Sequence, residues 1–348
     1  MKATFYRYFL KFKIPGGTSR GVLKQKETFF LLIDSNGKRG VGECGIFRGL
    51  SYDDREDYEE KLQWLCDNIS LGKELIMPEL KEFPSIQFGL EQAFLSLESK
   101  FGFDLFPSNF TRGKDSIPIN GLIWMGDEDF MKAQIEKKLK EGFTTLKMKI
   151  GAIDFDTELS LLKSIRNRYK PSELELRVDA NGAFSHKEAL GKLDLLSRLQ
   201  IHSIEQPIKA GQYEAMYNLC RATPLPIALD EELIGIVDFK DKKHLINTIQ
   251  PQYIILKPSL VGGFHGSKDW IRLAEDSGIG WWITSALESN IGLNAIAQFT
   301  YTLGNILPQG LGTGSLFTNN MNSPLFVEKG ALHYSNEGKW QKLEQFLK

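Results

Sequence analysis

Charged residues close five apolar segments of the chain at a regular spacing. They are Lys147 and Lys149, Asp179, Glu205, Asp230 and Lys257. From Asp179 onward they follow one another at steps of 26, 25 and 27 residues. Such steps fit one strand followed by one helix, so each residue would occupy the same place on its own strand. One charge at a strand end is ordinary, but five strands in register predict a reactive site.

The three acidic members of this series predict a metal site. Carboxylates that converge on one point repel one another unless a cation compensates them. A hard divalent ion with oxygen ligands does so, and Mg²⁺ fits a site that keeps positions open for a substrate. We therefore expect Asp179, Glu205 and Asp230 to bind one Mg²⁺ ion.

The basic members predict proton transfer. Lys147 and Lys149 are two positions apart on a strand, so both side chains point to the same face. Crowded ammonium groups lower each other's pKa, and a lysine tuned in this way can act as a base. Lys257 would approach from the far side. Lysines on both sides of a metal suit removal of a proton next to a carboxylate.

The elements that must position these residues begin near residue 116. From there, eight short apolar segments alternate with amphipathic ones, and the last apolar segment lies at 310–314. This alternation predicts βα units around a parallel sheet, of which a barrel is the closed form. We predict an α/β fold, a modified TIM barrel of (β/α)7β form over residues 116–321.

Residues 1–115 predict a second, α+β domain that caps the barrel. Strand-like patterns occupy 4–14, 28–37 and 38–44, and helical patterns occupy 53–69 and 85–100. The tail from 322 to 348 is strand-like and has no helix of its own. We expect the tail to return to the capping domain and complete it.

Composition narrows the class of protein. The chain has 348 residues, with 43 basic and 44 acidic ones, and this balance predicts no nucleic-acid partner. No apolar run is long enough to predict membrane insertion. Three scattered cysteines fit the reducing cytoplasm. We expect a small-molecule carboxylate as substrate, and the sequence leaves open a homo-oligomer.

Further candidates lie beside the charged series. Asn181, Gln206 and Glu231 closely follow the three carboxylates and could orient them, although ordinary loop polarity explains them equally well. Arg20 lies in a glycine-rich loop and could bind a substrate carboxylate, or be a surface arginine.

Two late segments could also contact the substrate. Ser285 closes the seventh apolar segment and could donate a hydrogen bond to the substrate. Gly312 and Thr313 belong to the glycine-rich stretch 310–314, whose backbone we expect to approach the substrate closely.

The charged series resembles the muconate-lactonising branch of the enolase superfamily. The hallmark of that branch is Lys-x-Lys followed by Asp, Glu, Asp and Lys, here in KMK, VDANG, IEQP, ALDEE and LKPSLVGG. The resemblance covers essentially the whole chain. It implies that Lys149 is the acid/base catalyst and that Lys257 is its partner on the opposite face. It also implies that Lys147 tunes the pKa of Lys149 and positions this residue.

Within the branch, PGGTSRGV and GECGIFRGLSYDD resemble the two specificity loops of members that form 2-succinylbenzoate. The resemblance implies dehydration of 2-succinyl-6-hydroxy-2,4-cyclohexadiene-1-carboxylate, a lyase reaction of menaquinone biosynthesis. Racemisation of N-acylamino acids and epimerisation of dipeptides are alternatives, although the Asp-x-Asp of the dipeptide epimerases is missing from GTGSLFTNN. A catalytically silent barrel is the third reading, and the intact charged series argues against it.

Overall fold

The computed structural model describes residues 1–18 and 21–347. Three antiparallel strands open the chain: β1 (Lys2–Thr18), β2 (Gly21–Ser35) and β3 (Lys38–Cys44). The turn between β2 and β3 is the two-residue Asn36-Gly37, and both residues have positive φ angles, of 51° and 75°. This conformation matches the twist of paired strands and favours Asn-Gly.

Alternate residues of β2 point to opposite faces of this sheet, and different parts of the chain cover the two faces. Phe29, Leu31 and Ile33 pack against the helices of the capping domain. Phe30 and Leu32 pack against Leu343, Phe346 and other late residues. The sheet is therefore an inner layer, with apolar contacts on both faces.

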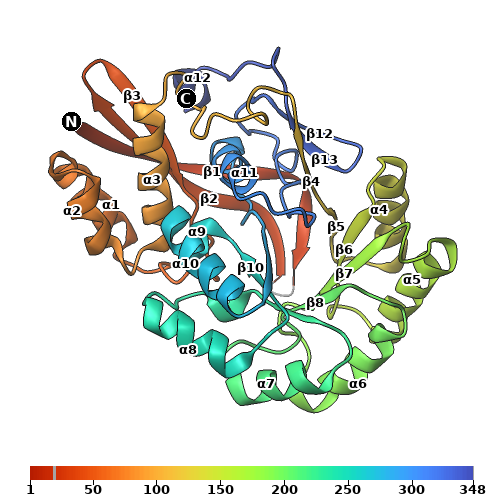
Figure 1. The fold of residues 1–348 in the computed structure, drawn as a ribbon. Helices are drawn as coiled ribbons and strands as arrows, with labels where there is room; N and C mark the ends of the chain where they lie inside the picture. Colours follow the sequence, from red (N-terminus) through yellow and green to blue (C-terminus); the bar gives the residue numbers. More distant parts are fainter. Residues whose placement is uncertain (19–20, 348) are drawn as a thin grey trace.

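Helical segments follow the sheet in the capping domain. They are α1 (Tyr58–Asn68), η1 (Ile69–Leu71), α2 (Lys73–Ile76), η2 (Met77–Leu80) and α3 (Pro84–Glu98). Helix α3 lies on β3 so closely that a Cβ atom on Gly42 would meet the Gly89 carbonyl oxygen at 1.9 Å. In Figure 1 the capping domain (red to orange) lies to one side of the barrel.

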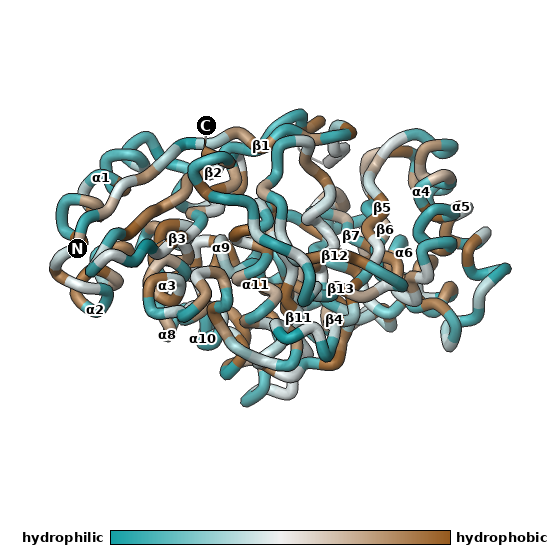
Figure 2. Tube along the Cα trace, turned by 90° about the horizontal axis from the view of Figure 1, so that it is seen from above, coloured by the Kyte–Doolittle hydropathy of each residue, from teal (hydrophilic) through white to brown (hydrophobic). Residues whose placement is uncertain are grey.

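The barrel is a curled parallel sheet whose seven strands run in chain order from β5 to β11. The strands are β5 (Gly121–Ile123), β6 (Thr145–Lys149), β7 (Glu175–Asp179), β8 (Ser203–Glu205), β9 (Ile227–Leu229), β10 (Tyr253–Leu256) and β11 (Gly280–Ile283). The intervening and following segments are α4 (Glu128–Lys140), α5 (Phe155–Arg168), α6 (His186–Ser197), α7 (Tyr213–Ala222), η3 (Glu231–Leu233), α8 (Phe239–Ile249), α9 (Pro258–Val261), α10 (Gly263–Asp276) and α11 (Asn290–Thr302). This is the predicted modified TIM barrel. The rim helices α4 and α5 carry many hydrophilic residues (teal in Figure 2).

The eighth strand position is shorter than the sequence predicted. Two single bridges fill it, with Gln309 beside Ile119 and Gly310 beside Thr284, and 310–314 forms no continuous strand. Gly310 approaches Thr284 so closely that an added Cβ atom would lie 2.0 Å from Thr284 Oγ1. The glycine at 310 is therefore explained by barrel closure.

The tail forms a hairpin and a short helix. Strands β12 (Leu325–Glu328) and β13 (Ala331–Tyr334) pair with β4 (Ser116–Pro118), which directly precedes the barrel. Helix α12 (Leu343–Phe346) lies on the N-terminal sheet, where the Phe346 ring is 4.7 Å from that of Tyr8. The proposed domain limits, at residues 115 and 321, remain a prediction.

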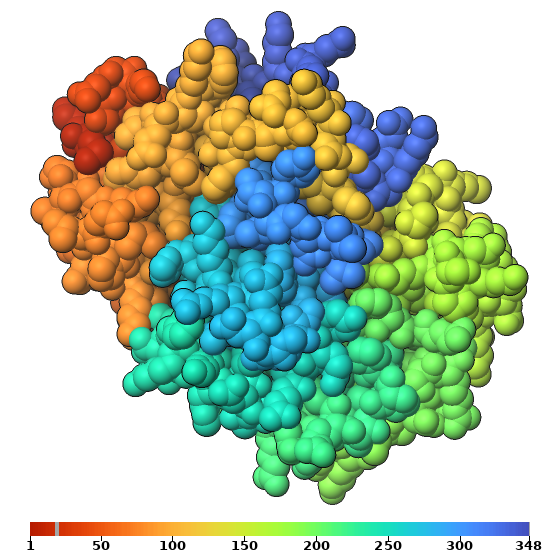
Figure 3. Space-filling view, viewed as in Figure 1, coloured from red at the N-terminus to blue at the C-terminus, as the bar shows by residue number. Residues whose placement is uncertain are grey.

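Figure 3 shows the capping domain and the barrel in close contact on this face, with the late residues (blue) covering part of both. Among the described residues, no helix is long and apolar enough to cross a membrane.

Candidate active site

Three of the charged residues are direct neighbours across the barrel sheet. Lys149 on β6 pairs in register with Asp179 on β7, and Asp179 pairs with Glu205 on β8. Each is the last residue of its strand. The regular spacing in the sequence therefore places these residues at the same level, at the carboxyl-terminal end of the barrel. Barrel enzymes carry out their chemistry at this end.

The remaining strands place their polar residues one or two positions beyond the last paired residue. Asp230 follows β9, Lys257 follows β10, and Ser285 lies two positions after β11. The side chains of Asp179, Glu205 and Asp230 are at most 2% exposed. Such deep burial of carboxylates requires compensating charge.

Lysines supply that charge in this structure. Lys147 Nζ donates to Glu205 Oε2 at 2.8 Å and to Asp179 Oδ2 at 3.3 Å. Lys149 Nζ donates to Asp179 Oδ2 at 2.8 Å, and Lys257 Nζ forms an ion pair with Asp230. The five strands thus bring the predicted cations and anions into one network.

The carboxylates respond to this network in opposite directions. Burial alone would raise the pKa of Asp179, but Lys149 and Lys147 outweigh burial and lower it. Burial raises the pKa of Glu205 to about 7, and repulsion from Asp179 adds to that rise while Lys147 opposes it. A further positive charge near Glu205 would therefore be favourable.

The pKa of Lys147 differs from the sequence expectation. Burial lowers it, but attraction to Glu205 and Asp179 is stronger, so the pKa is raised. The prediction that the two lysines hold each other's pKa down is wrong for Lys147 in this charge state. The physical reason is that each ammonium group lies within 2.8 Å of a carboxylate oxygen, which the sequence alone does not show.

One buried oxygen of the network lacks a partner. Among the described residues, Glu205 Oε1 is buried and accepts no hydrogen bond. In the same part of the chain, no three Asp, Glu, His or Cys side chains are already grouped as a metal site. The ammonium groups of Lys147 and Lys257 engage oxygens of the three carboxylates instead.

The residues that follow the carboxylates all contact the network. Asn181 Oδ1 accepts a hydrogen bond from Lys149 Nζ at 2.7 Å, and Asn181 Nδ2 donates to Glu231 Oε1 at 3.0 Å. Gln206 Oε1 accepts from the backbone N–H of Asp230 at 3.2 Å. Asn181 and Gln206 both have positive φ angles, of 43° and 39°, a conformation that costs energy outside glycine.

A cavity of about 490 Å³ opens above this network. The described residues that line it include six lysines but only one acid, Asp179. The lysines are Lys13, Lys137, Lys138, Lys147, Lys149 and Lys257. Lys137 and Lys138 pair with Glu141, and Lys147, Lys149 and Lys257 pair with the strand-end carboxylates. The cavity thus offers ammonium donors to an anionic small molecule, which would compete with these ion pairs.

Apolar side chains also line the cavity, and they include residues that the sequence analysis did not single out. Phe47 and Leu50 come from the capping domain, whereas Trp124, Leu287 and Leu316 come from the barrel. Trp124 directly follows β5, so it lies at a strand end as the charged residues do, but an apolar residue at that place carries no chemical signal in the sequence.

The other predicted contact residues lie as follows. Ser285, Gly312 and Thr313 line the cavity, and the hydroxyl groups of Ser285 and Thr313 are 2.7 Å apart. Arg20 lies outside the described residues, so its role in binding remains a prediction.

Comparisons with known proteins agree with this architecture. Residues 130–338 match the family model described as Enolase C-terminal domain-like. Over 96% of its length the chain is 46% identical to 99% of an o-succinylbenzoate synthase from Desulfotalea psychrophila. Over 56% of its length it is 28% identical to 52% of an L-Ala-D/L-Glu epimerase from Bacillus subtilis.

Solved structures show the same fold. MenC from Desulfotalea psychrophila superimposes with a TM-score of 0.85, at 44% identity, over 96% of this chain and 99% of that one. A Cytophaga hutchinsonii dipeptide epimerase complexed with Mg and a dipeptide has a TM-score of 0.82 at 22% identity, covering 98% and 96% of the two chains. The chain therefore belongs to the enolase superfamily, and within it to the family of the o-succinylbenzoate synthases.

Proposed function

We propose that this protein is a lyase that dehydrates 2-succinyl-6-hydroxy-2,4-cyclohexadiene-1-carboxylate to 2-succinylbenzoate. The observation that carries the proposal is the cavity, which six lysines and one acid line together with apolar side chains. The substrate has two carboxylates and an apolar ring, so its charge and shape complement these walls. The close relationship to an o-succinylbenzoate synthase supports the same reaction.

We propose further that Asp179, Glu205 and Asp230 bind Mg²⁺. The donor set fits a hard cation because all three side chains are buried carboxylates. The partnerless Glu205 Oε1 leaves one acceptor available to a cation. When bound, the ion would neutralise charge that develops on the substrate carboxylate.

Lys149 is the proposed acid/base residue. In its neutral form, Lys149 Nζ takes the proton from the carbon that bears the ring carboxylate. The resulting ammonium group returns the proton to the hydroxyl group, which leaves as water from the neighbouring carbon. One residue can perform both steps when the departing proton and hydroxyl group lie on one face of the ring, and formation of an aromatic ring drives the second step.

The other two lysines have supporting roles in the proposal. Lys257 Nζ lines the same cavity and would stabilise the anionic ring electrostatically. Lys147 Nζ lies between Asp179 and Glu205, where it holds these carboxylates in place and positions the neighbouring Lys149.

Racemisation of N-acylamino acids, or epimerisation of dipeptides, is the second candidate, since epimerases are among the relatives. Two lysines on one cavity suit such proton transfer. However, a dipeptide carries a free ammonium group, and Asp179 is the only acid among the described residues that line the cavity. A partner for that group is thus missing there, which favours an acidic substrate.

A substrate panel tests the proposal. The purified protein is incubated with Mg²⁺ and the cyclohexadiene acid, and separately with N-acylamino acids and dipeptides of one configuration. We expect 2-succinylbenzoate to form at the highest kcat/KM. Faster racemisation than dehydration would establish the second candidate, and no turnover of any substrate would establish a silent barrel.

A further inference from the structure

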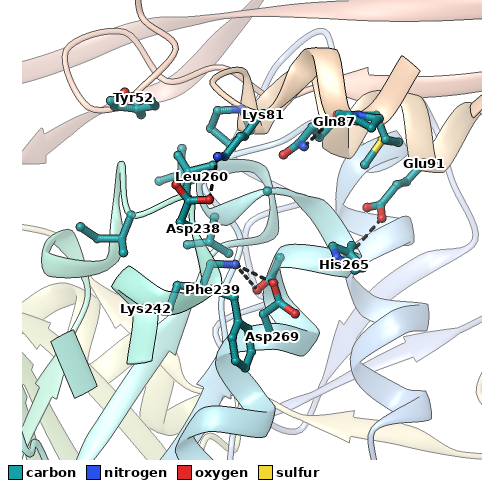
Figure 4. A pocket seen from close by; sticks show the side chains of 18 of the residues that line it. Tyr52, Lys81, Gln87, Glu91, Asp238, Phe239, Lys242, Leu260, His265 and Asp269 are labelled. Atoms are coloured by element: carbon teal, nitrogen blue, oxygen red, sulfur yellow. Dashed lines mark hydrogen bonds and ion pairs between the residues drawn. The ribbon is translucent and has the colours of Figure 1, made fainter. Parts of the chain in front are cut away.

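A second hollow lies between the capping domain and the barrel. This groove, of about 610 Å³, runs between α2, η2 and α3 on one side and α8, α9 and α10 on the other (Figure 4). Besides apolar packing such as that of Phe88 on Phe264, two polar contacts between the described residues join its sides. Lys81 forms an ion pair with Asp238 at 2.6 Å, and Glu91 on α3 reaches the beginning of α10.

The contact made by Glu91 replaces a missing helix cap. The first N–H groups of a helix lack partners within the helix, and a side chain at the preceding position usually accepts from them. Before α10 that position is Gly262, which has no side chain. Glu91 accepts instead from the N–H of Phe264 at 2.5 Å and from that of His265 at 3.1 Å.

The local backbone is built around this carboxylate. Gly262 and Gly263 have consecutive positive φ angles, of 93° and 71°. A Cβ atom on residue 263 would lie 2.1 Å from Glu91 Oε2. Both the conformation and the close approach therefore require glycine at 263.

The same segment carries Lys257. Helix α9 starts directly after Lys257, whose carbonyl oxygen accepts from the N–H groups of Leu260 and Val261 at 2.7 and 3.2 Å. Two glycines then join α9 to α10. Lys257 is thus seven positions before the first amide that Glu91 binds, and a turn of helix lies between them.

A second carboxylate of the capping domain makes a similar contact with the next βα unit. Glu43 on β3 accepts from the N–H groups of Ser289 and Gly292, both at 2.9 Å, at the beginning of α11. Helix α11 follows the strand that leads to Ser285. The capping domain therefore supplies carboxylates to both of the last two helices that follow site-bearing strands.

We infer that Glu91 is a positioning residue for Lys257, because it ties the α9–α10 segment to helix α3 of the capping domain. The inference rests on the role proposed above for Lys257. Glu91 accepts from two consecutive backbone N–H groups, so a side chain that cannot accept from both leaves one of these donors without its partner.

The test is a double-mutant cycle between Glu91→Gln and Lys257→Ala, measured as kcat and KM with Mg²⁺ present. A glutamine keeps the shape of the side chain, but its NH2 group donates and cannot accept from one of the two backbone N–H groups. We expect Glu91→Gln to lower kcat by about 10- to 100-fold, the scale of a displacement near 1 Å, with a smaller change in KM. In the Lys257→Ala background, Glu91→Gln should cause no further loss.

Asp238→Asn is the matched control, since it removes the other contact across the groove without touching α9 or α10. We expect its kcat to equal that of the wild type. Hydrogen exchange gives a readout that is independent of turnover, and amides 259–266 should exchange faster in Glu91→Gln but not in Asp238→Asn.

An equal loss of kcat in both Lys257 backgrounds, or no loss in either, would overturn the inference while leaving the proposed function intact. Wild-type kcat in the single Lys257→Ala variant would overturn the role of Lys257 itself, and the inference with it.

Discussion

Lys149 and Asp179 are register partners on adjacent strands, and Lys149 Nζ donates to Asp179 Oδ2 at 2.8 Å. The proposed base therefore lies beside the first proposed metal ligand. A cation on Asp179 would weaken this hydrogen bond and release Lys149 towards the substrate. In the proposed mechanism, metal binding and base activation would thus be coupled through one carboxylate.

The first prediction concerns the three carboxylates. Asp179→Asn, Glu205→Gln and Asp230→Asn should each lower activity by more than about 100-fold, since loss of a group that merely orients a metal ligand already costs about 10- to 100-fold. A chelator should abolish wild-type turnover, and Mg²⁺ should restore it. Asp194→Asn, on an exposed face of α6, is the control. Full turnover in excess chelator would refute the metal assignment.

The second prediction separates the two lysines. Deuterium uptake from D₂O is measured in an unreactive substrate analogue that keeps the acidic C–H bond. Lys149→Ala should stop exchange, because it removes the base. Lys257→Ala should slow exchange while preserving which face exchanges. Wild-type exchange in Lys149→Ala would exclude Lys149 as the base, whereas loss from only the opposite configuration in Lys257→Ala would favour a racemase.

The third prediction concerns barrel closure. Gly310→Ala should lower the free energy of unfolding by about 1–3 kcal/mol, because the added Cβ atom would lie 2.0 Å from Thr284 Oγ1. Gly312→Ala is the matched comparison. Its Cβ atom would meet nothing nearer than Ile119 Cδ1 at 3.4 Å, so we expect a change within about 0.5 kcal/mol. Denaturant unfolding of both variants measures the difference, and equal stabilities would contradict this account of closure.

The fourth prediction concerns pH and Asp53. Burial raises the pKa of this carboxyl group to about 6, although hydrogen bonds from Ser85 lower it. The folded state therefore holds the proton more tightly than the unfolded state does. This contribution stabilises the protein below pH 4 and is lost as the pH rises from about 4 to about 6.

Comparison of the wild type with Asp53→Asn isolates this contribution. Chemical denaturation at several pH values should show the wild type losing stability relative to the variant across that window. For Asp54→Asn the wild type should instead gain stability relative to the variant as the pH rises. The reason is that the Gly49 N–H and Arg48 lower the pKa of Asp54 despite the burial that raises it. Parallel curves for the wild type and Asp53→Asn would contradict the prediction.

The barrel could be predicted because its signal is repeated. Asp179, Glu205 and Asp230 recur at the length of one βα unit, and the structure has seven parallel strands at these intervals. The limits of the eighth strand could not be predicted, because Gln309 and Gly310 form only single bridges. Such bridges require no alternation of apolar and polar residues in the sequence. Closure there depends on contact with Ile119 and Thr284, which lie far away along the chain.

The charged residues of the site were predictable, but their electrostatics and the apolar walls were not. The sequence places Lys147 near Lys149, but it does not show that the Lys147 ammonium group lies 2.8 Å from Glu205 Oε2. Phe47 and Leu50 reach the cavity only because the capping domain folds over the barrel. Glu91 was equally hidden, since its partner amides are more than 170 positions away.

The packing of α12 on the first strands has a consequence for synthesis on the ribosome. Phe346 lies against Tyr8 and Phe30, so part of one apolar face of the N-terminal sheet lacks this cover until residue 346 has been translated. A nascent chain stalled within the barrel would expose this face, and chaperones that bind extended apolar strands would have their longest access there.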